Sequence, residues 1–296
     1  MAISRAQLVK ELEPGLNALF GLEYKRYENQ HAEIYTTESS DRAFEEEVML
    51  SGFANAQVKA EGQGVSFDDA QETYTARYTH DTIALAFAIT EEAIEDNLYD
   101  RIASRYTKAL ARSMSNAKQV KAVTPLIQGL PSTDNFDSGD AVSLFSTNHT
   151  TISGTAVKNT LTTQADLNET SLEQGLIDIA GMTDERGLRV AARGVKMIIP
   201  SANQFNAERL MKSQGRTGTA DNDINAVASM GMVPQGYRVN NFLTDTDSWY
   251  IITDVPNGMK MFQRAALKTA MEGDFDTGNV RYKARERYSF GVSDYR

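Results

Sequence analysis

The sequence predicts an α+β fold with an elongated outline. Three observations lead to this class: one long helical pattern after Thr90, stretches of period-two alternation on either side of it, and a helix–strand alternation within residues 171–256. Apolar residues at spacings of three and four predict helices, whereas strict alternation predicts strands with one buried face. Because the helical and strand patterns fall mostly in separate blocks, α+β is the class they indicate.

The composition is that of an ordinary globular protein, with 41% hydrophobic and 24% charged residues in a chain of 296. No run approaches the roughly 18 apolar residues that a membrane-spanning helix needs, so we expect no membrane partner. The absence of cysteine excludes disulfides, thiolate zinc sites and cysteine nucleophiles. The net charge of −10 favours solubility and opposes long-range attraction to nucleic acid.

The first 44 residues are predicted to form an arm. Leu16 and Leu19 belong to a series at helical spacing, but Pro14 and Gly15 interrupt it. Proline inside a helix removes a hydrogen bond and clashes with the preceding turn. One uniform helix is therefore not expected here.

Residues 45–89 are predicted to form a β excursion from the body. The acidic triplet Glu45-Glu46-Glu47 opens it, glycines mark its tip, and alternation follows that places Tyr74 and Tyr78 on one face. Fully extended, residues 72–89 would span about 60 Å, longer than ordinary strands. A hairpin reaching away from the body is favoured, and two shorter strands with a bend near His80 are the alternative.

The longest helix is predicted to begin at Thr90, a good N-cap followed by Glu91 and Glu92 in the first turn. Apolar residues then recur every three or four positions, and no glycine or proline occurs before Pro125. A helix of about 33 residues would be about 50 Å long. Since that is about the diameter of a compact domain of this size, a flattened subunit is expected.

The rest of the chain divides into three blocks. Residues 129–170 are rich in small polar side chains and predict loops with one strand at most. The final block predicts two strands, at 259–271 and 279–291, joined by a turn. The block between them predicts two helices and three strands, at 172–187, 195–199, 202–212, 237–243 and 249–255.

Four cationic side chains alternate along the last predicted strand: Arg281, Lys283, Arg285 and Arg287. Period-two spacing places all four on one face, where like charges repel unless anions lie opposite. Three interpretations stay open. The face is a solvated edge, it pairs with acidic surfaces of neighbouring subunits, or it contacts DNA. The candidate acidic partners are Glu45, Glu46, Glu47, Glu91 and Glu92.

We find no assembled catalytic or metal motif in the sequence. His31, His80 and His149 are far apart and lack a second ligand at metal-binding spacing, so we expect exposed or hydrogen-bonded histidines. Residues 274–279 are similar to the start of a calcium loop, but Arg285 stands where a glutamate is required. Residues 171–256 lack the Gly-x-Ser-x-Gly motif of a hydrolase. We therefore expect a non-enzyme without a cofactor, and a hydrolase on 171–256 is the less favoured alternative.

The order of these elements resembles the major capsid protein family of tailed bacteriophages. The closing stretch Phe275–Gly291 resembles the C-terminal signature of a subset of that family, and Leu144–His149 is similar to a segment that follows the family's spine helix. The resemblance implies five parts: N-terminal arm 1–44, extended β loop 45–89, spine helix and first part of the peripheral domain 90–170, axial domain 171–256, and closing peripheral strands 257–296.

What the resemblance implies is a structural subunit that assembles into an icosahedral head shell enclosing phage DNA. The implied partners are further copies in hexamers and pentamers, a portal, a decoration protein and double-stranded DNA without sequence specificity. Because about 44 residues precede the loop, we expect a separate scaffolding protein or a mature form. We expect Val65, Phe67 and Tyr74 to lie on a neighbouring subunit, in a virion assembled in the host cytoplasm. An encapsulin-type nanocompartment is the alternative.

Overall fold

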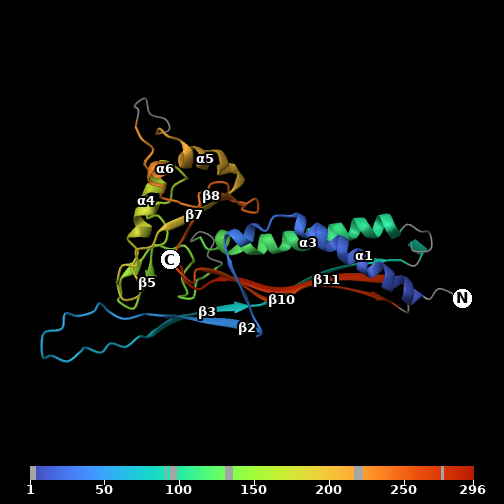
Figure 1. Ribbon diagram of the computed structural model, residues 1–296, viewed down its shortest axis with the longest axis horizontal. Coiled ribbons are helices and arrows are strands. Elements are labelled where there is room, and N and C mark those ends of the chain that lie inside the picture. The colour runs from blue at the N-terminus through green and yellow to red at the C-terminus, as the bar shows by residue number, and fades with distance from the viewer. Residues whose placement is uncertain (1–4, 91, 94–98, 131–135, 217–222, 275–276) are drawn as a thin grey trace.

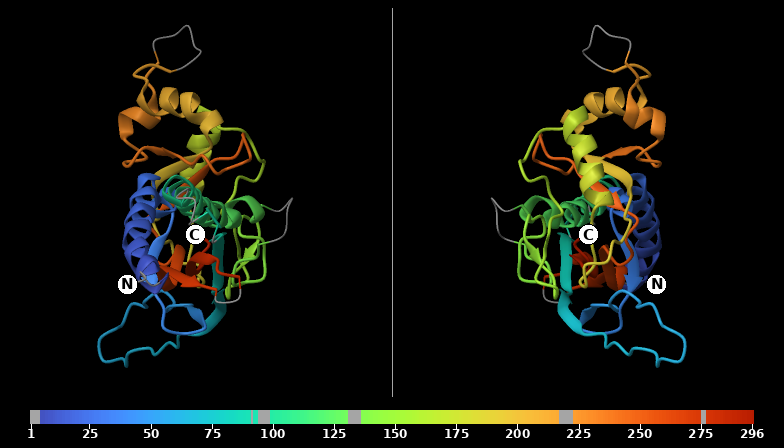
Figure 2. Two further views of the ribbon diagram at one scale, coloured as in Figure 1. Left: turned by 90° about the vertical axis from the view of Figure 1, so that its right-hand side faces the viewer. Right: turned by 90° about the vertical axis from the view of Figure 1, so that its left-hand side faces the viewer.

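The computed structural model describes residues 5–90, 92–93, 99–130, 136–216, 223–274 and 277–296. The molecule is elongated along a four-stranded sheet, and two helices lie over one face of it (Figure 1). A smaller α/β part stands beside one end of this sheet, and a long loop reaches past it (Figures 1 and 2). The flattened, extended outline agrees with the expectation from the long helix.

The sheet has the strand order β1-β10-β11-β4. Its central strands, β10 (Met259–Gly273) and β11 (Val280–Val292), are antiparallel and contain 15 and 13 residues. Both were predicted at nearly these bounds. Strand β4 (Asp81–Ile89) pairs with β11, and β1 (Thr36–Ser39) pairs with β10 in parallel. The short polar strand β1 was not predicted, because only its tertiary pairing makes it a strand.

Helix α3 (Tyr99–Gln128) confirms the long helix, with 30 described residues and a length of about 45 Å. Glu91 and residues 94–98 lie outside the described residues, but the Ala93 N–H donates to Thr90 Oγ1 at 3.4 Å. The helix continues through Pro125 to Gln128. Val123 and Leu126, which flank the proline, are buried in the core, and this packing outweighs the lost helical hydrogen bond.

The prediction that Pro14 prevents one uniform helix is wrong. Helix α1 runs from Arg5 to Arg26 with Pro14 inside it. Leu16 and Phe20 are buried in a core cluster with Met114 of α3 and Tyr282 of β11. Tertiary packing of this face holds the helix together where local propensity alone would break it.

The excursion is a ribbon of two antiparallel strands, β2 (Phe44–Leu50) and β3 (Glu72–Thr79), with the loop 51–71 at its end. The loop extends away from the body at the left of Figure 1. A single excursion through Ile89 is wrong, since the strand is interrupted at His80 and β4 joins the large sheet. His80 is buried between Ser40 and Ser289, at 2.9 and 3.0 Å, and these contacts hold the junction of the two strands.

The α/β part contains a three-stranded sheet in the order β8-β7-β9. Predicted strands at 195–199 and 249–255 are confirmed, whereas the strand predicted at 237–243 is shorter, and the helix predicted to about 187 ends at Ala180 before a turn. A short helix at 226–230 was not predicted. The elements are β7 (Gly194–Ile199), β8 (Tyr237–Val239), β9 (Tyr250–Thr253), α4 (Glu169–Ala180), α5 (Gln204–Lys212) and α6 (Ala226–Met230).

Short elements complete the structure. A 3₁₀ turn, η1 (Gln30–Glu33), joins α1 to β1, and a second, η2 (Ser201–Asn203), precedes α5. The loop-rich block after α3 holds one two-stranded ladder of β5 (His149–Thr150) and β6 (Ala156–Val157). Within the described parts of the chain, no helix is both long enough and apolar enough to cross a bilayer.

Candidate functional site

The cationic face predicted for the last strand is present on β11. Arg281, Lys283 and Arg285 are exposed, while Tyr282 and Ala284 between them are buried against α1 and α3. Arg287 is half-buried. The alternation therefore separates a cationic outer face from an apolar inner face, as the period-two spacing predicts.

Neighbouring strands extend this outer face, and among the described residues few acidic side chains pair with its cations. Lys268 of β10 lies directly opposite Arg285 in the ladder. On the other side, Ala84, Ala86 and Ala88 of β4 lie opposite Arg285, Lys283 and Arg281. Acidic compensation comes from Asp274, which pairs with Arg281, and from Glu272 in the ladder position opposite Arg281.

The inner face of β11 carries a buried acidic residue that the sequence analysis did not single out. Glu286 is 1% exposed and accepts a hydrogen bond from Lys118 Nζ of α3 at 2.6 Å. Tyr24 of α1 donates to the other carboxylate oxygen at 2.7 Å. Burial, and then the charge of Glu286, raise the pKa of the Tyr24 hydroxyl, so it stays a donor. The three residues tie both helices to the sheet.

The acidic triplet lies on β2 and is engaged within its own chain. Glu45 accepts from Ser40 Oγ at 2.7 Å, Glu46 lies 3.7 Å from Arg77, and Glu47 pairs with Lys260 at 2.5 Å. Among the described residues, no ion pair joins the triplet to the cations of β11. The structure thus does not bring these two predicted partners together within one subunit.

Of the three residues predicted to contact a neighbouring subunit, two are exposed on the loop and one packs against its own subunit. Val65 and Phe67 lie on the loop 51–71, where they are 69% and 97% exposed, and Val58 is 99% exposed. Tyr74 instead faces its own body, where its ring stacks on Tyr295 at 6.3 Å. The loop therefore leaves apolar side chains exposed in the single chain, whereas Tyr74 anchors the base of the excursion.

All three histidines are buried and hydrogen-bonded, and none is exposed. His31 contacts Gln119 at 3.0 Å, His80 lies between two serines, and His149 Nδ1 lies 2.6 Å from Asp140. Burial lowers the pKa of His31 and of His80. His31 and His80 each contact residues that are distant in sequence, and His149 contacts Asp140 within the loop-rich block. These contacts connect segments of the chain, which is a structural role.

Residues 293–296, which follow β11, form a buried network that sequence analysis missed. Tyr295 stacks on His149 with ring centroids 3.9 Å apart, and Arg296 pairs with Asp294 at 2.9 Å and Glu185 at 3.2 Å. Burial raises the pKa of the Glu185 carboxyl, although Arg296 opposes the shift. This network joins β11 to the loop-rich block and to the turn after α4.

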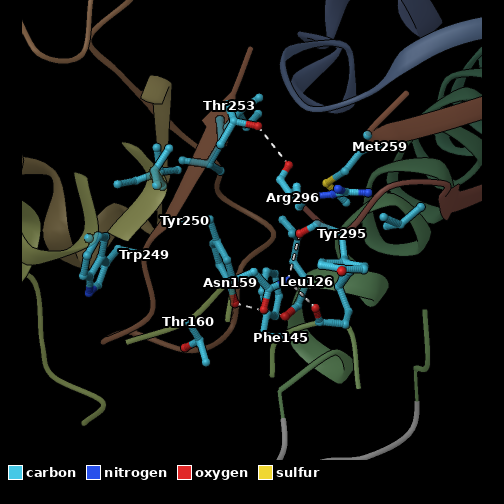
Figure 3. Close-up of a pocket in the computed structure, with 18 of the residues that line it drawn as sticks. Leu126, Phe145, Asn159, Thr160, Trp249, Tyr250, Thr253, Met259, Tyr295 and Arg296 are labelled. Carbon is cyan, nitrogen blue, oxygen red and sulfur yellow. Dashed lines mark hydrogen bonds between the residues drawn. The ribbon is translucent and has the colours of Figure 1, made fainter. Parts of the chain in front are cut away.

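A cavity of about 590 Å³ lies between the α/β part and this network. Figure 3 shows Trp249 and Tyr250 on one side, with Tyr295 and Arg296 on the other. One of its polar side chains is already bonded within the chain, since Asn159 Nδ2 donates to the Leu144 and Tyr295 carbonyls at 2.6 and 2.9 Å. Within the described residues, no group of three or more acidic, histidine or cysteine side chains could hold a metal ion.

The described residues place exposed cationic and apolar groups on the surface of the molecule. A rigid sheet-and-helix body carries an exposed cationic face, and a long loop carries apolar residues away from the body. The buried titratable groups serve to connect segments. Such a molecule is suited to assembling with other chains as a structural subunit.

Comparison with known proteins identifies the family. Residues 73–296 match the phage capsid protein family, and the chain belongs to it. No curated protein matches the chain. It is a structural, shell-forming subunit, as the resemblance implied.

Solved structures share the fold at low sequence identity. The capsid of an empty GTA particle matches with a TM-score of 0.56 and 14% identity, covering 89% of this chain and 86% of that chain. A virus-like particle from Pyrococcus furiosus gives 0.54 and 9%, covering 95% and 94%. The procapsid of bacteriophage JBD30 gives 0.52 and 14%, covering 99% and 74%. These likenesses confirm the predicted α+β capsid fold.

Proposed function

We propose that this protein is the major subunit of an icosahedral phage head that encloses double-stranded DNA. Copies of the chain form hexamers and pentamers, which together close the shell. The observation that carries the proposal is the loop 51–71, because its exposed Val58, Val65 and Phe67 gain burial only on another subunit.

The predicted parts of the chain keep their roles in this proposal, with one boundary changed. Residues 1–44 act as an arm, and the extended loop is 45–79, because β4 belongs to the large sheet. Residues 90–170 and 257–296 form the peripheral domain around α3, and 171–256 form the axial domain. The α/β sheet β8-β7-β9 and its own core cluster support an axial unit distinct from the large sheet.

Further partners follow from a head of this kind. A separate scaffolding protein guides assembly in the host cytoplasm, a portal occupies one vertex, a decoration protein covers the outside, and the finished virion holds the DNA. The net charge of −10 supports an inner wall that does not retain DNA tightly.

Electron microscopy of the overexpressed protein, alone and with the proteins of neighbouring genes, tests the proposal. We expect uniform closed shells, sheets or tubes. A protein that stays monomeric under all conditions, scaffold included, would contradict it. Closed shells from this chain alone would remove the need for a scaffold. Shells that take up an enzyme and no DNA would favour a nanocompartment.

A further inference from the structure

Helix α3 carries an excess of positive charge within an acidic protein. It contains six lysine and arginine residues and one acidic residue, whereas the whole chain has a net charge of −10. Lys118 and Lys121 form ion pairs inside the subunit. Among the described residues, no ion pair or side-chain hydrogen bond engages the cations Arg105, Lys108 and Arg112. Half of the positive charge of this helix is therefore available to a partner.

These three cations lie in one row along the helix, together with Asn116. Separations of three, four and four residues place Arg105, Lys108, Arg112 and Asn116 on the same face, over a length of about 16 Å. All four side chains are exposed. We call these four residues the α3 row. The opposite face of the helix, which includes Met114, packs in a core cluster with β11, so the row points away from the sheet (Figure 1).

The α3 row has a cost for the isolated subunit. Like charges three or four residues apart destabilise a helix, whereas a glutamate at such a spacing from lysine or arginine would stabilise it. The row contains no carboxylate that could offset the repulsion between its cations. An anionic partner from outside the subunit would remove this repulsion, and the row is therefore suited to bind one.

The side chains of the row are those that bind DNA phosphates. Contacts to the DNA backbone come from arginine, lysine and polar side chains such as asparagine, and they carry no sequence information directly. Duplex DNA presents one negative charge per about 1.7 Å of its axis. A row of about 16 Å therefore meets several phosphates whatever the base sequence. In the proposed head, packaged DNA is the polyanion enclosed by every shell.

The cationic face of β11 points the opposite way and is the competing surface. Tyr282 packs in the cluster between the sheet and the helices, so Arg281, Lys283 and Arg285 lie on the far side of the sheet from α3. A shell wall turns only one of these two faces toward its contents. The β11 face has its own acidic partner, since Arg281 pairs with Asp274. The α3 row has none among the described residues, which favours the row as the phosphate site.

We propose that the α3 row lines the interior of the shell and binds the phosphates of packaged double-stranded DNA without regard to base sequence. This inference rests on the proposed function, which supplies the shell and the DNA. It goes further in naming the residues that meet the DNA and the face of the subunit that points inward. Each contact is weak, because the net charge of −10 opposes it and because salt confines the attraction to about 8–10 Å.

The salt dependence of DNA binding by the full-length, unassembled subunit tests the assignment. The probe is a short fluorescent duplex of arbitrary sequence, and anisotropy gives the binding constant at a series of salt concentrations. The logarithm of that constant falls with the logarithm of salt concentration by about 0.9 per phosphate contact. The variant Arg105→Gln/Lys108→Gln/Arg112→Gln should therefore reduce the slope by about 2.7, and equally for duplexes of different sequence.

The matched control removes the same charge from the opposite face. The variant Lys268→Gln/Lys283→Gln/Arg285→Gln changes three exposed cations of β10 and β11, so general repulsion of DNA rises equally in both variants. Its slope should equal that of the wild type. A lower slope in this control with an unchanged slope in the α3 variant would overturn the inference. Wild-type subunit that does not bind the duplex even at low salt would also overturn it.

Assembly of the same two variants distinguishes DNA from an acidic protein partner. The α3 variant should form closed shells with nearly normal yield. Loss of shells with an unchanged salt slope would show that the row pairs with acidic side chains of another subunit, and would overturn the assignment to DNA. Wild-type protein that forms no shells under any condition would instead contradict the proposed function itself.

Lysine acetylation of wild-type particles provides a second measurement. Lys108 should lose its reactivity in DNA-filled shells and regain it once the DNA has been released, as measured by mass spectrometry. Lys283 on the opposite face should react equally in both. Equal acetylation of Lys108 in filled and emptied shells would overturn the inference while leaving the proposed function standing.

Discussion

Lys118 and Glu286 show how one buried pair connects three elements. Their side chains are 10% and 1% exposed, and Tyr24 completes the hydrogen bonding of the carboxylate. Removing charges from water is costly, so such a pair is retained only with good geometry. It joins α3 to β11, and through Tyr24 it also holds α1.

Breaking this pair from one side should strongly destabilise the subunit. Glu286→Gln leaves the Lys118 charge buried without a counter-ion, and we expect a loss of about 3–5 kcal/mol in the free energy of unfolding. The double variant Lys118→Met/Glu286→Leu should recover most of that loss. Urea denaturation of the unassembled subunit measures both.

The exposed pair Glu208–Lys212, at 3.0 Å on α5, is the matched control. Glu208→Gln should leave the denaturation midpoint almost unchanged, since water replaces the lost partner. If the double variant at 118 and 286 were as unstable as Glu286→Gln alone, the loss would come from packing and not from the unpaired charge.

The buried histidines predict a dependence of stability on pH. Burial lowers the pKa of His31 and His80 below the ordinary 6.5. Below pH 6.5 the unfolded chain therefore binds protons more readily than the folded one. Stability should be complete above pH 6.5 and fall as the pH drops toward the folded-state pKa values. For each pH unit by which folding lowers a histidine pKa, the free energy of unfolding changes by about 1.4 kcal/mol.

Denaturation at a series of pH values from 7.5 to 5.5 checks this prediction. The variant His31→Gln/His80→Gln should lose part of the pH dependence, because glutamine does not titrate. An unchanged slope would mean that other groups dominate in this range.

At the scale of elements, local sequence patterns correctly predicted the helices and strands whose conformation tertiary packing did not change. Strands β10 and β11 and helix α3 were predictable because their apolar residues follow one period over many positions. Helix α1 was not, since Phe20 and Leu16 hold it through Pro14 by contacts with distant residues. The pairing of β4 with β11 was equally hidden, because alternation shows that a strand exists but not its partner.

Gly291 of β11 allows the excursion to pack on the sheet. A Cβ there would lie 2.5 Å from the Tyr78 ring of β3, and Tyr78 also hydrogen-bonds to Ser293. Gly291→Ala should cost about 1–3 kcal/mol through overpacking and loosen the base of the ribbon. Thermal denaturation and proteolysis of the loop 51–71 measure the two effects.

Gly273→Ala is the control in the partner strand, because a Cβ there meets nothing within 4 Å. It should change neither the melting temperature nor the rate of loop cleavage appreciably. Equal effects of the two substitutions would argue against the Tyr78 contact as the cause.

At the scale of the molecule, the sequence predicted which residues share the cationic face but not which residues pair with the acidic triplet. Spacing alone placed Arg281, Lys283 and Arg285 on an exposed face. The internal partners of Glu45, Glu46 and Glu47 could not be foreseen, because they come from Ser40, Arg77 and Lys260, which folding brings near. The same holds for Tyr74, whose partner Tyr295 lies more than two hundred positions away.

Removing one exposed ring from the loop should separate assembly from folding. Phe67→Ser removes a side chain that is 97% exposed in the subunit, so the free energy of unfolding should not change. The yield of shells should fall about tenfold or more, since an aromatic anchor at an interface is worth about 2 kcal/mol. Sedimentation and microscopy measure the yield.

Ile177→Ser on α4, where the side chain is 64% exposed, is the matched control. It should assemble with nearly normal yield if the loop carries the contact. Full assembly of Phe67→Ser would show that the ring stays in solvent within the shell.

The position of β11 in the large sheet also limits how early in synthesis the sheet can fold. It is an interior strand, yet both α1 and β4, which it joins, are synthesised far ahead of it. During translation the apolar faces of α1 and β4 stay exposed until β11 has been synthesised. Contacts of such long sequence separation slow folding and prolong exposure to aggregation. We therefore expect refolding in the range of seconds or slower, with a marked benefit from chaperones.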